Sequence, residues 1–338
     1  MNITTSSAFA GLTELASEKV NGKVLYCTDD FFAEKENLLK VKPAIFLPDE
    51  YTDHGKWMDG WESRRKRTEG YDWAVIRLGI PGYVKGVDID TAFFTGNHPP
   101  YASVWGAKLE DGADEDSLYK EKMEWTEIVP KASLNPGSQN LFSTINNLDY
   151  FTHLRLNIFP DGGVARLRVY GDVYKKWKEN YNGEQIDLAG LVNGGKVIIC
   201  NDMYFGSKDN LNSPTKSMYM GDGWETKRKR IPGYDWCILK LAEPGSIQKI
   251  MVDTAHFKGN FPDTCSIEGV NLPHLEDYRV TDTMITWKEI LPKVKLQADT
   301  EHFFEEEIVS KEVFTHVKLN IFPDGGVSRL RIYGVLSK

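Results

Sequence analysis

The sequence predicts an all-β protein made of two copies of one unit, each a β-sandwich or jelly roll. Three observations favour this fold class. The chain repeats itself once, apolar residues alternate with polar ones along each half, and long amphipathic helices are missing between the alternating segments. Alternation with a period of two is typical of half-buried strands, whereas a parallel sheet needs a crossover helix after each strand. Antiparallel sandwiches joined by Gly-, Pro-, Asn- and Asp-rich turns therefore fit best.

The repeated blocks occur in the same order in both halves, with nearly constant spacing, which indicates a tandem duplication. We predict a first repeat at residues 1–171, a polar linker at 172–187 and a second repeat at 188–338. The blocks pair as FTHLRLNIFPDGGVARLRVYG (151–171) with FTHVKLNIFPDGGVSRLRIYG (314–334), DGWESRRKR (59–67) with DGWETKRKR (222–230), and DTAFFTGN (90–97) with DTAHFKGN (253–260).

The elements of the first repeat follow from local patterns, taken in chain order. Apolar residues at helical spacing predict a short helix within residues 31–39, and alternation predicts strands at 73–77 and 87–89. Ile-Pro-Gly at 80–82 is expected to form a turn between these strands. The two alternating runs on either side of FPDGG in 151–171 predict a hairpin, because proline fixes φ and glycine permits positive φ.

Length, composition and charge limit the possible functions. The chain has 338 residues, 41% hydrophobic and 12% aromatic, so it folds, and its length suits two domains at roughly 100–200 residues each. A formal charge of −8 argues against a nucleic-acid partner. No apolar run approaches the roughly 20 residues of a membrane span.

The cysteines and the chain ends indicate the compartment. The four cysteines form no CxxC pair, and neither cysteines nor histidines have the spacing of a metal site. We expect free thiols in a reducing cytoplasm. No secretory signal and no peroxisomal Ser-Lys-Leu ending is evident. Nothing in the sequence requires a cofactor, and a bound divalent metal ion stays an open alternative.

We expect the catalytic and binding side chains on three loop blocks, because such residues lie more often on loops than on regular strands. Glu62 stands beside four cations, which could grip an anion or form a self-neutralising turn. Asp90 could line a pocket or cap its own turn. The Pro-Asp-Gly turn is enough to account for Asp161. Arg166 could bind an anion, or it could simply lie on the solvent-exposed face of its strand. No phosphate loop, GxSxG or HExxH motif is present, so these residues alone predict no reaction.

Histidines are candidates for a base. His153 and His316 alternate with core leucines and are expected to point outward as structural side chains. The two repeats differ at His54, His98 and His256, where a base would be sought if only one repeat were catalytic.

The duplicated blocks resemble those of the allantoicase family, and look closest to its fungal members. The resemblance is carried by DGWESRR (59–65), DTAFFTGNHP (90–99) and FPDGGVAR (159–166) with their second copies, and it extends over residues 15–334. It implies two jelly-roll repeats of the galactose-binding-like kind. It also implies hydrolysis of allantoate to ureidoglycolate and urea, a step in the use of purine nitrogen. It brings no assigned catalytic residues with it.

Substrate chemistry then suggests site residues as hypotheses. Allantoate carries one carboxylate and two ureido groups on one carbon, so a site needs a cation and acceptors for ureido N–H groups. Releasing urea needs a proton on the leaving nitrogen and water on the carbon, which one acid and one base supply. The candidate catalytic residues are Glu62, Asp90, Glu225 and Asp253. The candidate substrate-binding residues are Arg64, Arg65, Arg166 and Arg228 for the carboxylate, and Asn97, His98, His256 and Asn260 for the ureido groups.

Several alternatives stay open at this level. One or both repeats could be active, with a site in each or one shared site. A non-catalytic, galactose-binding-like protein that binds a ligand is the competing class, and a scaffold that serves only assembly is a third. A homo-oligomer is expected, but the sequence does not give its symmetry.

Overall fold

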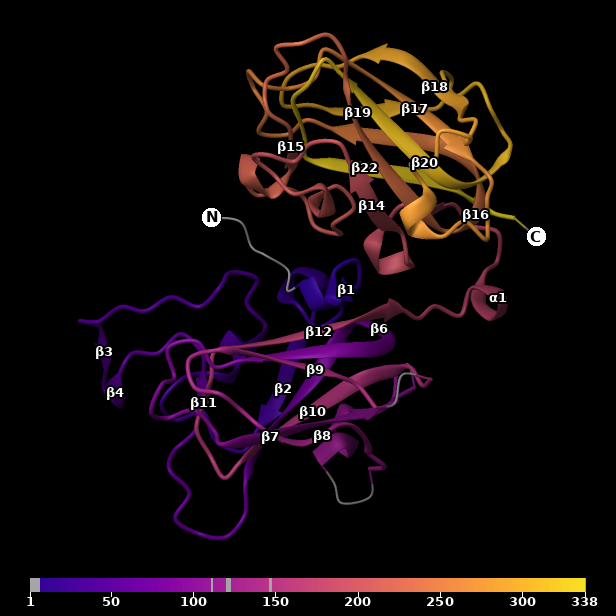
Figure 1. Cartoon of the computed structure of the whole chain (residues 1–338). Coiled ribbons are helices and arrows are strands. Elements are labelled where there is room, and N and C mark those ends of the chain that lie inside the picture. The colour runs from indigo at the N-terminus through magenta and orange to yellow at the C-terminus, as the bar shows by residue number, and fades with distance from the viewer. Residues whose placement is uncertain (1–6, 111, 120–122, 146–147, 338) are drawn as a thin grey trace. The chain divides into compact units, whose positions relative to one another are not determined.

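The chain divides into two compact units, residues 1–175 and 176–338, which we describe separately (Figure 1). The computed structural model describes residues 7–110, 112–119, 123–145 and 148–337. The division falls within the predicted linker at 172–187.

The first unit consists of twelve strands and short 3-10 helices in its described residues. The strands are β1 (Thr13–Glu14), β2 (Lys23–Cys27), β3 (Tyr51–Thr52), β4 (Gly55–Lys56), β5 (Trp61–Glu62), β6 (Asp72–Asp90), β7 (Tyr101–Ala107), β8 (Thr126–Ser133), β9 (Gln139–Ser143), β10 (Phe151–Phe159), β11 (Gly163–Val164) and β12 (Arg166–Val173). The 3-10 helices are Ser7–Phe9, Glu18–Val20, Lys35–Leu39 and Glu115–Tyr119.

The second unit repeats this order without counterparts of β3 and β4 among its described residues. It begins with one turn of α-helix, α1 (Trp177–Asn180). Its strands are β13 (Ile186–Asp187), β14 (Lys196–Cys200), β15 (Trp224–Glu225), β16 (Asp235–Asp253), β17 (Thr264–Val270), β18 (Lys288–Lys295), β19 (Glu301–Phe304), β20 (Val313–Phe322), β21 (Gly326–Val327) and β22 (Arg329–Leu336), and its 3-10 helices are Leu191–Asn193, Lys208–Asn210, Met220–Asp222 and Asp277–Arg279.

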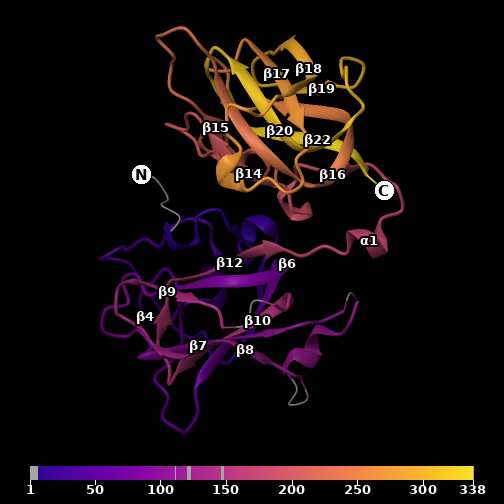
Figure 2. The same cartoon turned by 45° about the vertical axis from the view of Figure 1, so that its right-hand side comes forward.

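One long strand joins the two layers of each sandwich. In the first unit the N-terminal half of β6 pairs with β2 and β10, and its C-terminal half pairs with β12 and β9, all antiparallel. Strands β7 and β8 extend the β10 layer, as Figures 1 and 2 show. The turn predicted at 80–82 is therefore wrong: β6 continues through Pro81 while it passes from one layer to the other. In the second unit β16 does the same around Gly245.

Alternating apolar side chains fill the space between the layers. In the first unit Ile76, Ile89, Leu156 and Leu167 are fully buried, and the second unit has the equivalent core. The predicted all-β fold of two repeated sandwiches is confirmed. The predicted free thiols are confirmed as well: Cys237 and Cys265 are buried, and the two other cysteines are half-buried.

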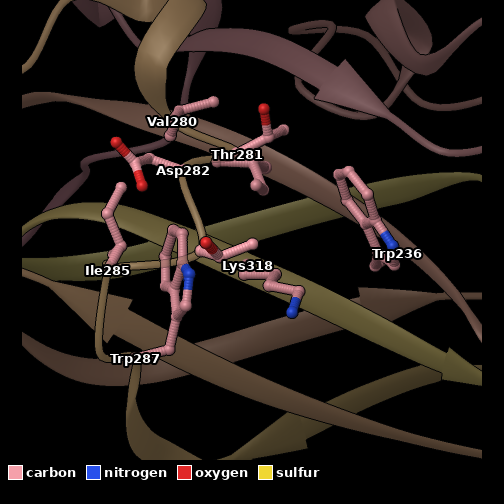
Figure 3. Close-up of a pocket in the computed structure, with 9 residues that line it drawn as sticks. Trp236, Val280, Thr281, Asp282, Ile285, Trp287 and Lys318 are labelled. Carbon is pink, nitrogen blue, oxygen red and sulfur yellow. The ribbon is translucent and has the colours of Figure 1, made fainter.

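The outward position predicted for His153 and His316 is wrong, because irregular segments cover the strands on that side. His153 is buried, and its Nε2 lies 3.6 Å from the carboxylate of Glu115 in a 3-10 helix. His316 is fully buried, and burial lowers its pKa to about 4. In the second unit the covering segment, residues 280–287, leaves a cavity of about 230 Å³ over the same layer, with Trp236 and Trp287 on its walls (Figure 3).

No helix in the described residues is both long enough and apolar enough to cross a membrane.

Candidate active site

A rigid turn after β6 carries the second predicted block. The Oδ1 atom of Asp90 accepts a hydrogen bond from the backbone N–H of Ala92 at 2.8 Å, so Asp90 caps its own turn. Phe94 is fully buried, and a Cβ atom on Gly163 would lie 2.0 Å from its ring. Phe93 has φ of 69°, a conformation that is an outlier for a bulky residue. Packing of its neighbour Phe94 therefore holds Phe93 in a fixed, partly exposed position.

Glu62 and Asn97 form a pair where the three predicted blocks meet. Glu62 ends β5, which pairs with β11 immediately after the FPDGG turn. The side-chain amide of Asn97 donates a hydrogen bond to Oε1 of Glu62 at 2.6 Å, and the carbonyl of Asn97 accepts one from the Gly163 N–H at 2.8 Å. A Cβ atom on Gly162, whose φ is 138°, would lie 2.7 Å from that carbonyl. The two glycines thus allow the loops to approach closely enough for the pair to form.

The second unit repeats this arrangement. Asn260 donates a hydrogen bond to Oε1 of Glu225, and β15 pairs with β21 in the same register. Burial raises the pKa of the carboxyl groups of both Glu62 and Glu225, and the hydrogen bond from the asparagine partly offsets this. Raising the pKa of a carboxyl group favours its protonated form, which is the form that a proton donor needs.

A cavity of about 340 Å³ lies beside Glu62 in the first unit. This volume is within the usual range of small-molecule sites, roughly 300–1,000 Å³. Apolar and polar residues contribute about equally to its wall, and the polar groups come from different elements. The apolar lining includes Phe32, Phe46, Met58 and Phe93, and the polar lining comprises Lys56, Glu62, Thr95 and Asn97.

The predicted carboxylate-binding arginines lie in different surroundings. Arg166 is buried, and its guanidinium donates to the carboxylate of Asp59 at 2.7 Å and to three backbone carbonyls. The guanidinium of Arg64 is paired with Asp29 at 2.6 Å. Arg65 and Arg228 are exposed. The structure does not bring these four side chains into the described lining of the Glu62 cavity.

The remaining predicted residues are held mainly by their own loops. Asp253 accepts from the backbone N–H of Ala255 at 2.7 Å, as Asp90 does in its turn, and burial raises the pKa of both carboxyl groups. The Nε2 atom of His256 lies 3.0 Å from the carbonyl of Ser217. His98 is half-buried beside Asn97.

Sequence reasoning missed two contributors to this region, Lys56 and Phe46. They belong to a segment that is longer in the first repeat than in the second. Leu38 and Asp59 are 21 positions apart, whereas their equivalents Leu211 and Asp222 are 11 apart, so the spacing between blocks is not constant here. That difference was the available signal. Outside the lining of the cavity, burial and the neighbouring Asp90 raise the pKa of Asp88 to about 7.

Within the described residues, no group of three or more His, Cys, Asp and Glu side chains could hold a metal ion. The polar groups of the cavity are one carboxyl, one amide, one hydroxyl and one ammonium. This set can transfer a proton, hold N–H groups and bind an anion.

Comparison with known proteins identifies the family. The family model described as the allantoicase repeat matches residues 13–174 and 186–337. The chain belongs to the allantoicase family. The probable allantoicase of Pseudomonas fluorescens SBW25 is 48% identical over 333 residues, which cover 98% of this chain and 99% of that protein. The probable allantoicase of Photobacterium profundum is 49% identical over 330 residues, 98% of either chain.

A solved allantoicase shares the fold. The crystal structure of the Saccharomyces cerevisiae allantoicase aligns with a TM-score of 0.79 and 38% identity, over 95% of this chain and 92% of that one. The two bacterial relatives are therefore more similar in sequence to this chain than the yeast protein is. The family and the hydrolase class predicted from the duplicated blocks are confirmed, and the non-catalytic alternative is not favoured.

Proposed function

We propose that this allantoicase hydrolyses allantoate to ureidoglycolate and urea at Glu62, which Asn97 orients, and that Glu225 with Asn260 forms the corresponding pair of the second unit. The observation that carries the proposal is the Glu62–Asn97 hydrogen bond beside a cavity, at the junction of all three duplicated blocks. The raised pKa of Glu62 supports its role, because a proton donor must hold its proton at working pH.

The reaction needs one group that gives a proton and takes one back. The Glu62 carboxylic acid protonates the leaving ureido nitrogen while the bond from that nitrogen to the central carbon breaks, and urea departs with the bonding electron pair. The lone pair of the remaining ureido nitrogen forms a C=N bond to the carbon. Water then adds to the carbon, and the Glu62 carboxylate accepts its proton. Ureidoglycolate is formed, and Glu62 returns to the protonated state.

In this proposal Asn97 determines which oxygen of the Glu62 carboxyl group carries the transferred proton. Its amide donates to Oε1, so the proton resides on Oε2 and that oxygen faces the substrate. The carbonyl oxygen of the same amide is an acceptor that a ureido N–H group can use.

The other predicted residues have supporting roles in this proposal. Asp90 and Asp253 fix the turns that carry the asparagines. Arg64, the exposed Arg65 and Arg228 raise the local concentration of an anionic substrate around a chain of net charge −8. Arg166 fixes the loop that contains Asp59. The histidines His98 and His256 are further ureido contacts.

The test is to replace Glu62 and Glu225 separately by Gln and to measure urea release from allantoate. Glu62→Gln preserves the shape and the Asn97 contact but cannot donate the proton, so kcat falls by about 10²–10⁴-fold. Wild-type kcat in a folded Glu62→Gln variant contradicts the assignment. The Glu225→Gln variant shows whether the second unit contributes to turnover.

We further propose that the enzyme works without a cofactor, in a reducing cytoplasm, as a homo-oligomer. The free thiols support the compartment. Exposed large apolar side chains of the second unit, such as Ile231, Tyr278 and Met284, are candidates for contacts between copies. Light scattering after size exclusion gives the oligomeric state, and full activity after dialysis against a chelator is expected.

A further inference from the structure

The segment between the 3-10 helix Lys35–Leu39 and β5 is the largest difference between the two units near the paired carboxylates. In the first unit it contains the hairpin of β3 and β4, in which Tyr51 pairs with Lys56, and Figure 1 shows this hairpin projecting from the unit. The equivalent segment of the second unit is ten positions shorter. Two lining residues of the Glu62 cavity, Phe46 and Lys56, come from this segment.

We propose that Lys56 binds the carboxylate of the substrate and makes the first unit the site of allantoate turnover. The inference rests on the proposed function of Glu62. It assigns a specificity-determining residue to a segment that is ten positions longer than its equivalent in the second unit.

Charge is the first argument. Allantoate brings a carboxylate into a cavity that already holds the half-buried carboxyl group of Glu62, so a cation is needed there to offset the charge of the substrate. Among the described lining residues Lys56 is the one cation. In the described part of the chain its ammonium forms no ion pair, whereas Arg64 is paired with Asp29 and Arg166 with Asp59. Lys56 therefore has its charge available for a ligand.

Geometry is the second argument. The Lys56 ammonium lies 4.5 Å from the centroid of the Phe46 ring, in cation–π contact. Phe46 in turn stacks on Phe93, with ring centroids 5.6 Å apart and planes 18° from parallel. Phe93 is fixed by the turn that also carries Asn97. The hairpin cation is thus connected by two ring contacts to the turn that orients Glu62, so the anion site and the proton donor keep a defined separation.

The second unit presents a different set of residues at the equivalent positions. His256 replaces Phe93 and Lys258 replaces Thr95, and, counted back from the shared DGWE block, Tyr219 stands where the first unit has Lys56. Lys258 is exposed, on the loop just before Asn260. Lys258 provides a matched control for Lys56. It is a lysine close in sequence to the Glu225–Asn260 pair, but among the residues that the structure describes it is not part of a hairpin like β3–β4 and lacks the aromatic contacts of Lys56.

The experiment compares Lys56→Met with Lys258→Met in the full chain, on allantoate and on its neutral carboxamide analogue. Losing a charge-assisted hydrogen bond predicts a rise in KM for allantoate of about 10- to 100-fold in Lys56→Met, with kcat nearly unchanged. Lys258→Met keeps the wild-type KM. Turnover of the carboxamide is the same in Lys56→Met and wild type, and Lys56→Arg restores most of the affinity for allantoate. A merely structural role of Lys56 would impair both substrates.

Two results overturn the inference: an unchanged KM for allantoate in Lys56→Met, or an equal rise in Lys258→Met. If Glu62→Gln abolishes turnover while Lys56→Met has no effect, the proposed function stands and only the carboxylate assignment fails. If Glu62→Gln itself is fully active, the proposed function fails as well.

Discussion

The buried ion pair of Arg166 and Asp59 gives a quantitative prediction about the first unit. Arg166 is 1% exposed and Asp59 is 7% exposed. The guanidinium donates to the Asp59 carboxylate at 2.7 Å, to the Asp59 and Lys42 carbonyls at 2.9 Å, and to the Ala165 carbonyl at 2.7 Å. Arg166→Met removes all four hydrogen bonds and leaves a buried carboxylate whose one other cationic partner among the described residues is Lys40, at 3.5 Å.

Removing one partner of a buried pair costs about 3–5 kcal/mol. This is a large part of the 5–15 kcal/mol by which a typical domain is stable, so Arg166→Met should selectively unfold or loosen the first unit. Because two units need not unfold in one transition, the assay is hydrogen exchange followed by mass spectrometry, peptide by peptide. Arg329→Met, which breaks the equivalent pair with Asp222 (2.9 Å), is the matched control and should affect only the second unit.

Replacing both partners, Arg166→Met with Asp59→Leu, should recover much of the lost free energy, because no buried charge is then left alone. A change in unfolding free energy below about 1 kcal/mol in the first-unit peptides of Arg166→Met would refute the reasoning. Equal losses in both units would also refute it, since the four hydrogen bonds of the guanidinium go to residues of its own unit.

Two further predictions concern the site and its pH dependence. Gly162→Ala should lower turnover by up to about 100-fold without unfolding the chain, because the added Cβ atom displaces the Asn97 carbonyl that it would approach to 2.7 Å. Gly96→Ala, whose Cβ atom would meet open space, should keep wild-type urea release. Asp88 has a folded-state pKa of about 7, above its ordinary value of 3.8, so its contribution to stability is present at low pH and is lost as the pH rises through 7. Denaturant unfolding of Asp88→Asn should therefore show a gain over wild type that grows between pH 4 and pH 7. A gain that is constant with pH contradicts this.

Much of the fold was predictable because its information is local. Alternation in 151–171 predicts the strands and the turn, and duplication predicts that the second unit repeats them. The turn expected at 80–82 failed because a strand can bend around proline and glycine while its hydrogen bonds pass to new partners. The burial of His153 was not predictable from its own strand, since the cover comes from an irregular segment nearly 40 positions earlier in the chain.

The candidate site was predicted in parts rather than as an arrangement. Glu62 and Asn97 were each candidates, but they are 35 positions apart, and only the pairing of β5 with β11 brings their loops together. Arg166 was indistinguishable from a ligand-binding arginine, because its carboxylate partner lies 107 positions away. Lys56 was missed for a different reason. The candidate residues were taken from the blocks that both copies share, whereas Lys56 lies in the segment that differs in length between the copies.

The strand that passes between both layers also limits how the two copies can diverge. β6 and β16 are both 19 residues long. Deleting one residue from either strand would reverse the inward and outward faces beyond the deletion, and the effect would reach both layers of the sandwich. The loop that precedes β5 carries no such register, and it differs by ten residues between the units. The largest length difference thus lies in the segment beside the paired carboxylate, outside the long strand whose register both layers share.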